Sequence, residues 1–199
     1  STPKPSSAAS DVYKRQDQYI AAYGGVTCFT FEKDGNVVVE PLRLSVESLE
    51  RLENNLLLFY TGIERDASDI LEEQDKKSKE EDPKMVENLH RIKEIGLETR
   101  RLLERGDIDA IGELFHEHWE TKKKRSDKMT NPFFEEIYEE ARENGALGGK
   151  IVGAGGGGFF VFYCPNNDRA KLFESMERMG LKYMKFRFDF EGAKILVNT

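Results

Sequence analysis

The sequence GGKIVGAGGGGFF at residues 148–160 places a run of glycines between two strand-like segments. Those segments, residues 150–152 and 159–164, are rich in β-branched and aromatic side chains, and the second is apolar at successive positions, as in a central strand. Glycine adopts positive φ without steric cost, and consecutive backbone amides in such a turn can form an anion-binding concavity. We therefore predict a phosphate-facing or active-site loop made of Gly153, Ala154, Gly155, Gly156 and Gly157. The alternative is a glycine-rich bulge at which two backbones pack closely.

Strand-like and helical patterns alternate on both sides of this loop. Asp34, Gly35 and Asn36 separate two β-branched or aromatic runs and predict a hairpin. Periodicity predicts further strands at residues 56–60, 184–190 and 193–197, and helices at residues 46–53, 83–104, 133–145 and 172–179, with a helical start to residues 63–79. Asp107 is the expected N-cap of one more helix, whose inner face carries Ile108, Ile111, Phe115 and His118 or Trp119. Together these elements predict an α+β fold with helices on one face of a mainly antiparallel sheet.

The composition excludes several classes of protein. The 199 residues include 34% charged side chains and carry a formal net charge of −7, which disfavours non-specific binding to nucleic acid. The longest apolar runs are far shorter than the roughly 18 residues that cross a bilayer, so we expect neither a membrane span nor a secretory signal. Cys28 and Cys164 lie in apolar strand-like runs, which favours buried thiols in a reducing cytoplasm over a disulfide or a metal site.

Two polar features of the helical region have a structural and a functional interpretation. His116 and His118 are two residues apart on a helix and point in different directions, so a histidine buried in the core is favoured over a metal pair. The basic run at residues 122–125 is most simply the solvated C-terminal end of a helix, where positive charge suits the helix dipole. The functional alternative is that this run attracts an anionic substrate.

The first residues differ in character from the rest. SSAASDVYKRQ at residues 6–16 matches the in-frame translation of a common transposase-type sequencing adapter. We therefore expect residues 1–16 to be a disordered adapter translation and residues 17–199 to hold a domain together with the tail end of a missing N-terminal domain. The alternative is a natural Ser- and Pro-rich leader, which would also be unstructured.

The sequence resembles the GHMP small-molecule kinases. The glycine segment at residues 148–160 looks like the third signature motif of that superfamily, and DQYIAAYGG at residues 17–25 is similar to the segment after its ATP-binding motif. The resemblance covers residues 17–199 and implies a ferredoxin-like antiparallel sheet with helices on one face and extra helices. The P-x-x-x-G-L-G-S-S-A motif of the family, which binds the ATP triphosphate, does not occur in the sequence.

The resemblance also implies site residues. Asp17 matches the family's catalytic carboxylate, the glycine loop would line the active site, and ATP and Mg²⁺ would be required. Gly24 and Gly25 could let a substrate approach the backbone or could serve only a turn. Tyr60, Thr61, Gly62 and Arg65 follow a strand, where substrate contacts are favoured. Arg65 could hold a substrate phosphate bidentately, with an ordinary surface arginine as the alternative. We expect no metal site made by the protein alone.

Several quoted segments, among them residues 34–45, 56–74, 116–123 and 186–196, resemble the sugar-kinase branch of the family. They imply transfer of phosphate to the anomeric hydroxyl of D-glycero-D-manno-heptose 7-phosphate in the cytoplasm, for nucleotide-activated heptose and surface glycans. The partners would be a sugar phosphate and ATP, without nucleic acid or membrane, and the oligomeric state stays open. An L-fucokinase-like enzyme and a non-catalytic α+β binding domain are the alternatives. Because the ATP-binding motif is absent, we expect these residues alone to show no kinase activity.

Overall fold

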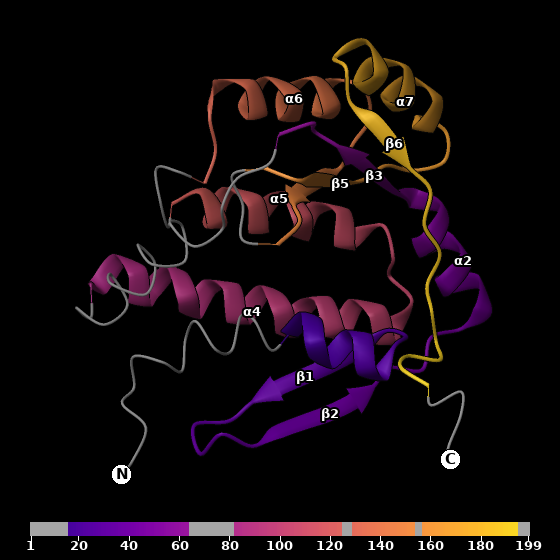
Figure 1. The fold of residues 1–199 in the computed structure, drawn as a ribbon. Helices are drawn as coiled ribbons and strands as arrows, with labels where there is room; N and C mark the ends of the chain where they lie inside the picture. Colours follow the sequence, from indigo (N-terminus) through magenta and orange to yellow (C-terminus); the bar gives the residue numbers. More distant parts are fainter. Residues whose placement is uncertain (1–15, 64–81, 125–128, 154–156, 195–199) are drawn as a thin grey trace. The chain divides into compact units, whose positions relative to one another are not determined.

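The computed structural model describes residues 16–63, 82–124, 129–153 and 157–194. The chain divides into two compact units, one formed by Ser1–Leu44 with Arg187–Thr199 and the other by Ser45–Phe186. Figure 1 shows their elements in the order of the chain. Among the described residues, no helix is long and apolar enough to span a membrane.

The first unit contains the predicted hairpin. A helix at residues 16–23 precedes β1 (Thr27–Phe31), which pairs antiparallel with β2 (Val37–Pro41) so that Phe29 lies opposite Val39. Gly35 in the turn has a φ of 91°, and the Asp34 carboxylate accepts a hydrogen bond of 3.0 Å from the backbone N–H of Asn36. The turn is therefore of the Asp- and Gly-dependent kind that the sequence predicted.

The predicted strand at residues 184–190 is wrong. The structure has only β6 (Lys182–Met184), and residues 185–189 form no strand. The carbonyl oxygen of Asp189 instead accepts a hydrogen bond of 2.6 Å from the N–H of Gly25. A strand continues only as far as a neighbouring strand pairs with it, and the described pairing on β3 ends at Met184.

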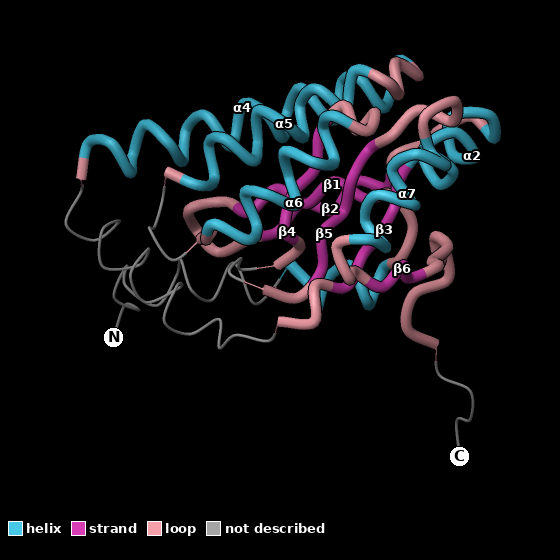
Figure 2. Tube along the Cα trace, turned by 90° about the horizontal axis from the view of Figure 1, so that it is seen from above, coloured by secondary structure: helices cyan, strands magenta, loops and turns pink. Residues whose placement is uncertain are grey.

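The second unit is a four-stranded sheet in the order β4-β5-β3-β6, with all neighbours antiparallel. Its strands are β3 (Leu56–Tyr60), β4 (Gly148–Ile151), β5 (Phe159–Tyr163) and the short β6. The chain order of strand, helices, two strands, helix and strand is that of the ferredoxin-like fold. The predicted α+β class is confirmed, and β5 is an inner strand as predicted (Figure 2).

Five helices with defined ends belong to the described part of this unit. They are α2 (Val46–Asn55), α4 (Pro83–Arg105), α5 (Ala110–Lys123), α6 (Pro132–Glu143) and α7 (Arg169–Arg178). Asn131 caps α6 as predicted, since its side chain accepts a hydrogen bond of 2.9 Å from the N–H of Phe134. The helical start predicted for residues 63–79 lies almost entirely outside the described residues.

The N-cap predicted at Asp107 is wrong, because α5 begins at Ala110 after Asp109. Gly106 ends α4 with a φ of 79°, and the N–H of Asp107 donates to the carbonyl oxygen of Leu102 at 3.0 Å. Asp107 thus completes the left-handed C-cap of α4, and α5 begins only after Asp109, whose side chain makes no capping hydrogen bond. Ile108 and Ile111 are buried as expected, and Trp119, not His118, is the fully buried member of the predicted pair.

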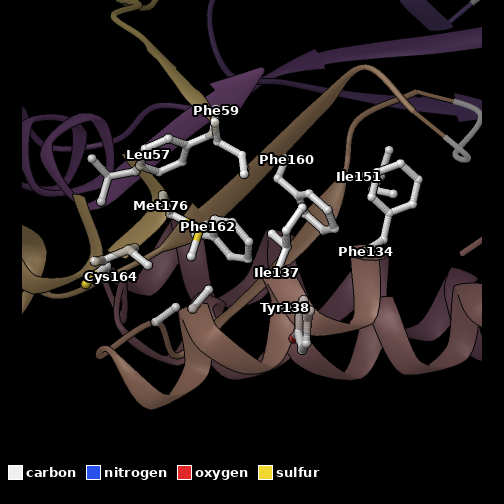
Figure 3. Packing of buried hydrophobic residues seen from close by; sticks show 14 of the residues in the cluster. Leu57, Phe59, Phe134, Ile137, Tyr138, Ile151, Phe160, Phe162, Cys164 and Met176 are labelled. Carbon is white, nitrogen blue, oxygen red and sulfur yellow. The ribbon is translucent and has the colours of Figure 1, made fainter. Parts of the chain in front are cut away.

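One face of the sheet carries the hydrophobic core. Phe160 and Phe162 of β5 stack with ring centroids 5.1 Å apart and point toward Ile137 and Tyr138 of α6 (Figure 3). Each of these fully buried phenylalanines contributes about 1.5–3 kcal/mol of transfer free energy. The opposite face is only half covered, since Phe159 and Val161 are of intermediate exposure. The helices α6 and α7 lie over the core face, as the predicted one-sided arrangement requires (Figures 1 and 2).

The two cysteines differ in their surroundings. Cys164 follows β5 and is fully buried, and burial raises the pKa of its thiol to about 11. Cys28 in β1 is only half-buried. The prediction of a buried thiol is therefore confirmed for Cys164 and not for Cys28.

Candidate functional site

The ends of the glycine loop have backbone conformations that require glycine. Gly153 and Gly158 have φ values of 79° and 85°, which L side chains rarely adopt. A Cβ atom built at either position meets no atom within 4 Å, so packing does not exclude a side chain there. Conformation and not close packing is what requires glycine at these two positions, and the alternative of tightly packed backbones does not apply to them.

Thr61 and Ile63 fix the end of the loop that leads into β5. The backbone N–H and the hydroxyl of Thr61 both donate to the carbonyl oxygen of Gly158, each at 2.9 Å. The N–H of Gly158 in turn donates to the carbonyl oxygen of Ile63 at 2.8 Å. Thr61 is only 7% exposed, so water competes little for these bonds. The segment that follows β3 therefore holds the exit of the loop.

Lys122 of α5 holds the other end of the loop. Its ammonium donates to the carbonyl oxygens of Ile151 at 3.2 Å and of Gly153 at 2.6 Å, and the residue is only 4% exposed. The prediction of a solvated basic run is wrong for this residue. Lys122 follows Trp119 by three positions, so the helical period places it on the inner face of α5. Its neighbour Lys123 pairs with Glu120 at 2.7 Å and Glu135 at 2.9 Å.

Tyr60 is the one predicted substrate residue that the structure places beside the loop. It lies opposite Phe159 in the β3–β5 ladder, and their ring centroids are 5.1 Å apart. Gly157 immediately precedes the fixed Gly158. Ala154, Gly155, Gly156 and Arg65 lie outside the described residues.

Asp17, Gly24 and Gly25 belong to the other compact unit. Asp17 is exposed on the helix at residues 16–23. Gly24 and Gly25 have φ values of 68° and 66°, and a Cβ atom on Gly24 would lie 2.8 Å from the backbone nitrogen of Gly192. Both glycines thus serve a turn that packs closely against the C-terminal segment of its own unit.

The histidines and acidic residues supply no evident cage for a metal ion. The Nδ1 atom of His116 lies 2.9 Å from the Tyr138 hydroxyl, and burial raises the pKa of Tyr138. Among the described residues, no cluster of three or more His, Cys, Asp or Glu side chains could hold a metal ion. Magnesium in phosphoryl transfer is commonly held by one or two carboxylates together with substrate phosphates, so a protein cage is not required for it.

A polar cavity of about 320 Å³ lies at the far end of β5 from the glycine loop. It is lined by Arg51, Asn54, Asn55, Asp109, Pro165, Asn166 and Asn167. The Tyr163 hydroxyl donates to Asp109 at 2.6 Å and accepts from Asn55 at 2.9 Å, and Arg51 forms an ion pair with Asp109. These side chains satisfy one another, which is the arrangement of a structural network.

The sequence placed Thr61 at a strand end and Lys122 in a basic run, but it did not predict that they hold the glycine loop. Lys122 continues the spacing of Ile111, Phe115 and Trp119, so helical periodicity contained the signal for its burial. Thr61 directly follows a buried strand, where ligand-facing and loop-holding residues often lie, but no pattern distinguished it from its neighbours. The structure thus places Tyr60 and Thr61 at the end of the glycine loop that leads into β5, and Lys122 at the end that follows β4.

The described strands thus form a ferredoxin-like α+β domain in which a glycine loop connects the neighbouring strands β4 and β5. Residues 99–180 match the family model "GHMP kinases C terminal". The chain therefore contains a GHMP kinase C-terminal domain, as the resemblance implied.

Named relatives agree with this assignment. The chain is 35% identical over 179 residues to D-glycero-alpha-D-manno-heptose 7-phosphate kinase of Campylobacter jejuni, covering 90% of this chain and 52% of that protein. It is 28% identical over 159 residues to a bifunctional fucokinase/GDP-fucose pyrophosphorylase of Arabidopsis thaliana, covering 78% of this chain and 15% of that protein. The chain thus spans about half, or less, of the length of these relatives.

A solved structure also matches. The crystal structure of a candidate sugar kinase from Campylobacter jejuni superposes with a TM-score of 0.67 at 28% identity, covering 94% of this chain and 55% of that one. The fold of this chain is therefore similar to that of the Campylobacter protein over 94% of this chain.

Proposed function

We propose that residues 17–199 are the C-terminal part of an ATP-dependent sugar kinase that phosphorylates the anomeric hydroxyl of D-glycero-D-manno-heptose 7-phosphate. The observation that carries this proposal is the 35% identity to the Campylobacter heptose 7-phosphate kinase over 90% of the chain. The product would feed nucleotide-activated heptose for surface glycans such as lipopolysaccharide, and the enzyme would act in the cytoplasm.

Phosphoryl transfer depends mainly on positioning the reactants and stabilising charge. In this proposal Asp17 accepts or orients the proton of the sugar hydroxyl, and Arg65 binds the 7-phosphate. Gly153, Ala154, Gly155, Gly156 and Gly157 border the transferring phosphate with backbone alone, and Tyr60 lines the sugar side. Mg²⁺ would arrive bound to the ATP phosphates and neutralise their charge.

A fucokinase-like enzyme is the second candidate, and the similarity to the Arabidopsis protein favours it. The two substrates differ in one charged group, since fucose carries no phosphate. Arg65 should therefore matter to a heptose 7-phosphate kinase and not to a fucokinase. A non-catalytic binding domain would use neither Asp17 nor Arg65.

The test is a substrate screen of the protein completed with the sequence that precedes it in its gene. ADP release from ATP would be followed with heptose 7-phosphate, with L-fucose and without sugar. We expect turnover with heptose 7-phosphate alone, a loss of about 10²–10⁴-fold in kcat for Asp17→Asn, and a higher KM for the sugar phosphate in Arg65→Met. Turnover of fucose without heptose 7-phosphate would favour the second candidate, and no sugar-dependent turnover would favour the binding domain. The 199 residues alone should be inactive.

A further inference from the structure

Lys122 is a buried cation whose ammonium reaches the backbone of the glycine loop. We propose that it is a positioning residue, which fixes the entrance of this loop in the conformation used for phosphoryl transfer. The functional half of this inference rests on the proposed kinase activity, and the structural half does not.

The contacts of Lys122 span the point where β4 becomes the loop. Its ammonium donates to the carbonyl of Ile151, the last residue of β4, and to the carbonyl of Gly153, which has a positive φ. Between them, the N–H of Val152 donates to the carbonyl oxygen of Phe159 at 2.8 Å. The ammonium therefore bridges two carbonyls on either side of the last ladder bond, and fixes the direction in which the chain leaves the sheet.

Packing alone does not explain a lysine here. Removing an ammonium from water costs several kcal/mol, and only good hydrogen bonds offset that cost. Charge-assisted bonds to carbonyls provide this compensation, whereas a Met side chain of similar length would fill the same space without needing it. The two carbonyl contacts thus give the ammonium a role that a Met side chain could not fill.

A glycine loop needs such external contacts because it has no side chains of its own to restrict it. Thr61 provides them at the exit, through two bonds to the carbonyl of Gly158, and Lys122 provides them at the entrance. Fixing both ends before the substrate binds reduces the ordering that binding must accomplish. A misplacement of about 1 Å at a reacting centre can lower a rate roughly 100-fold.

The structural half is tested by amide hydrogen exchange on the 199-residue chain. The variant is Lys122→Met, and the matched control is Lys124→Met, which removes an exposed lysine at the end of the same helix. We expect exchange at Val152 and Gly158 to accelerate at least tenfold in Lys122→Met, with α7 unchanged, and no change in Lys124→Met. Unchanged exchange at Val152 would overturn the proposal, and so would a uniform acceleration across the chain, which would indicate general destabilisation.

The functional half is tested by kinetics of the completed enzyme. Lys122→Met should lower kcat about 10- to 100-fold with an unchanged KM for the sugar, and Lys122→Arg, which keeps two donors, should recover part of the loss. Combined with Gly153→Ala, the effects should be non-additive because both act on one backbone position. Additive effects would overturn the positioning role. If the unmodified enzyme has no sugar-dependent turnover, the proposed function fails while the exchange result still decides whether Lys122 holds the loop.

Discussion

Tyr163 shows how a single side chain can link three segments of the fold. It ends β5, and its hydroxyl donates to Asp109 ahead of α5 and accepts from Asn55 at the end of α2. Asn55 is only 4% exposed, so its amide depends on this bond. Burial, followed by the bond to Asp109, raises the pKa of the Tyr163 hydroxyl.

We predict that Tyr163→Phe destabilises the chain by about 1–3 kcal/mol, because the buried Asn55 amide loses its acceptor. The pH dependence has a defined sign. Because the folded pKa is raised, the contribution of Tyr163 is complete below about pH 10 and is lost as the pH rises further. Urea unfolding between pH 8 and 11 should therefore show a shallower alkaline decline in Tyr163→Phe. The control is Tyr23→Phe, at a residue that is 52% exposed; equal alkaline slopes in all three proteins would contradict the prediction.

Residue-scale prediction from sequence succeeded where the cause was local. Asn131 caps α6 because its own side chain reaches the N–H of Phe134, three residues away. The prediction for Lys122 failed because a lysine is usually exposed to solvent. The carbonyl oxygens that offset the cost of its burial belong to residues 151 and 153, far from it in the sequence. No local pattern contains those carbonyls, although the helical period already placed Lys122 on the inner face.

At the scale of elements, α5 and β4 approach each other through glycine. A Cβ atom on Gly148 would lie 2.1 Å from the carbonyl oxygen of Gly112 and 2.4 Å from the backbone nitrogen of His116. Both obstacles are backbone atoms, so no side chain can move aside. The helix and the strand would have to separate.

We predict that Gly→Ala changes in β4 and in α4 alter the unfolding free energy in opposite directions. Gly148→Ala should lower the unfolding free energy by several kcal/mol, on the order of the larger core substitutions. Gly96→Ala should raise it by up to about 1 kcal/mol, because Gly96 lies within α4 and a Cβ there meets no atom within 4 Å. Thermal and urea unfolding of both variants measures this. A Gly148→Ala protein as stable as Gly96→Ala would contradict the close approach of α5 to β4.

Element predictions failed where an element depends on a distant partner. Residues 184–190 alternate like a strand, but the described pairing with Leu58, Phe59 and Tyr60 of β3 covers only β6 and ends at Met184. Asp107 has a side chain typical of an N-cap, yet its N–H completes the C-cap of α4, and α5 begins three residues later, at Ala110. The order of the sheet followed from the family resemblance and not from periodicity, which carries no information on which strands are neighbours.

At the scale of the whole molecule, the candidate site is less predictable than the fold. The run of glycines predicted the loop, and the end of a predicted strand pointed to Tyr60, which the structure places opposite Phe159 beside the loop. Asp17 is assigned through resemblance alone and lies in the other compact unit, so its role as catalytic carboxylate stays a prediction. Catalytic placement depends on distances of an ångström or so, which composition and periodicity do not specify.

Among the residues that the structure describes, the main hydrophobic cluster lies within one of the two compact units. The members of the main buried cluster, from Leu57 to Leu181, all belong to Ser45–Phe186. A unit with its own core can fold independently. We therefore predict that a chain of residues 45–186 unfolds cooperatively, with a near-UV circular dichroism spectrum from its packed aromatic residues and a melting temperature within a few degrees of the full chain.

The matched comparison is a chain of residues 99–180, the segment that matches the kinase family model. It lacks β3 and with it Leu57 and Phe59, which pair with Phe162 and Phe160 across the centre of the sheet. Its β5 would keep β4 on one side and expose an apolar edge on the other, which favours aggregation. We expect this shorter chain to show no cooperative transition. Cooperative folding of residues 99–180, or its absence in residues 45–186, would mean that the β3–β5 pairing does not hold the core together.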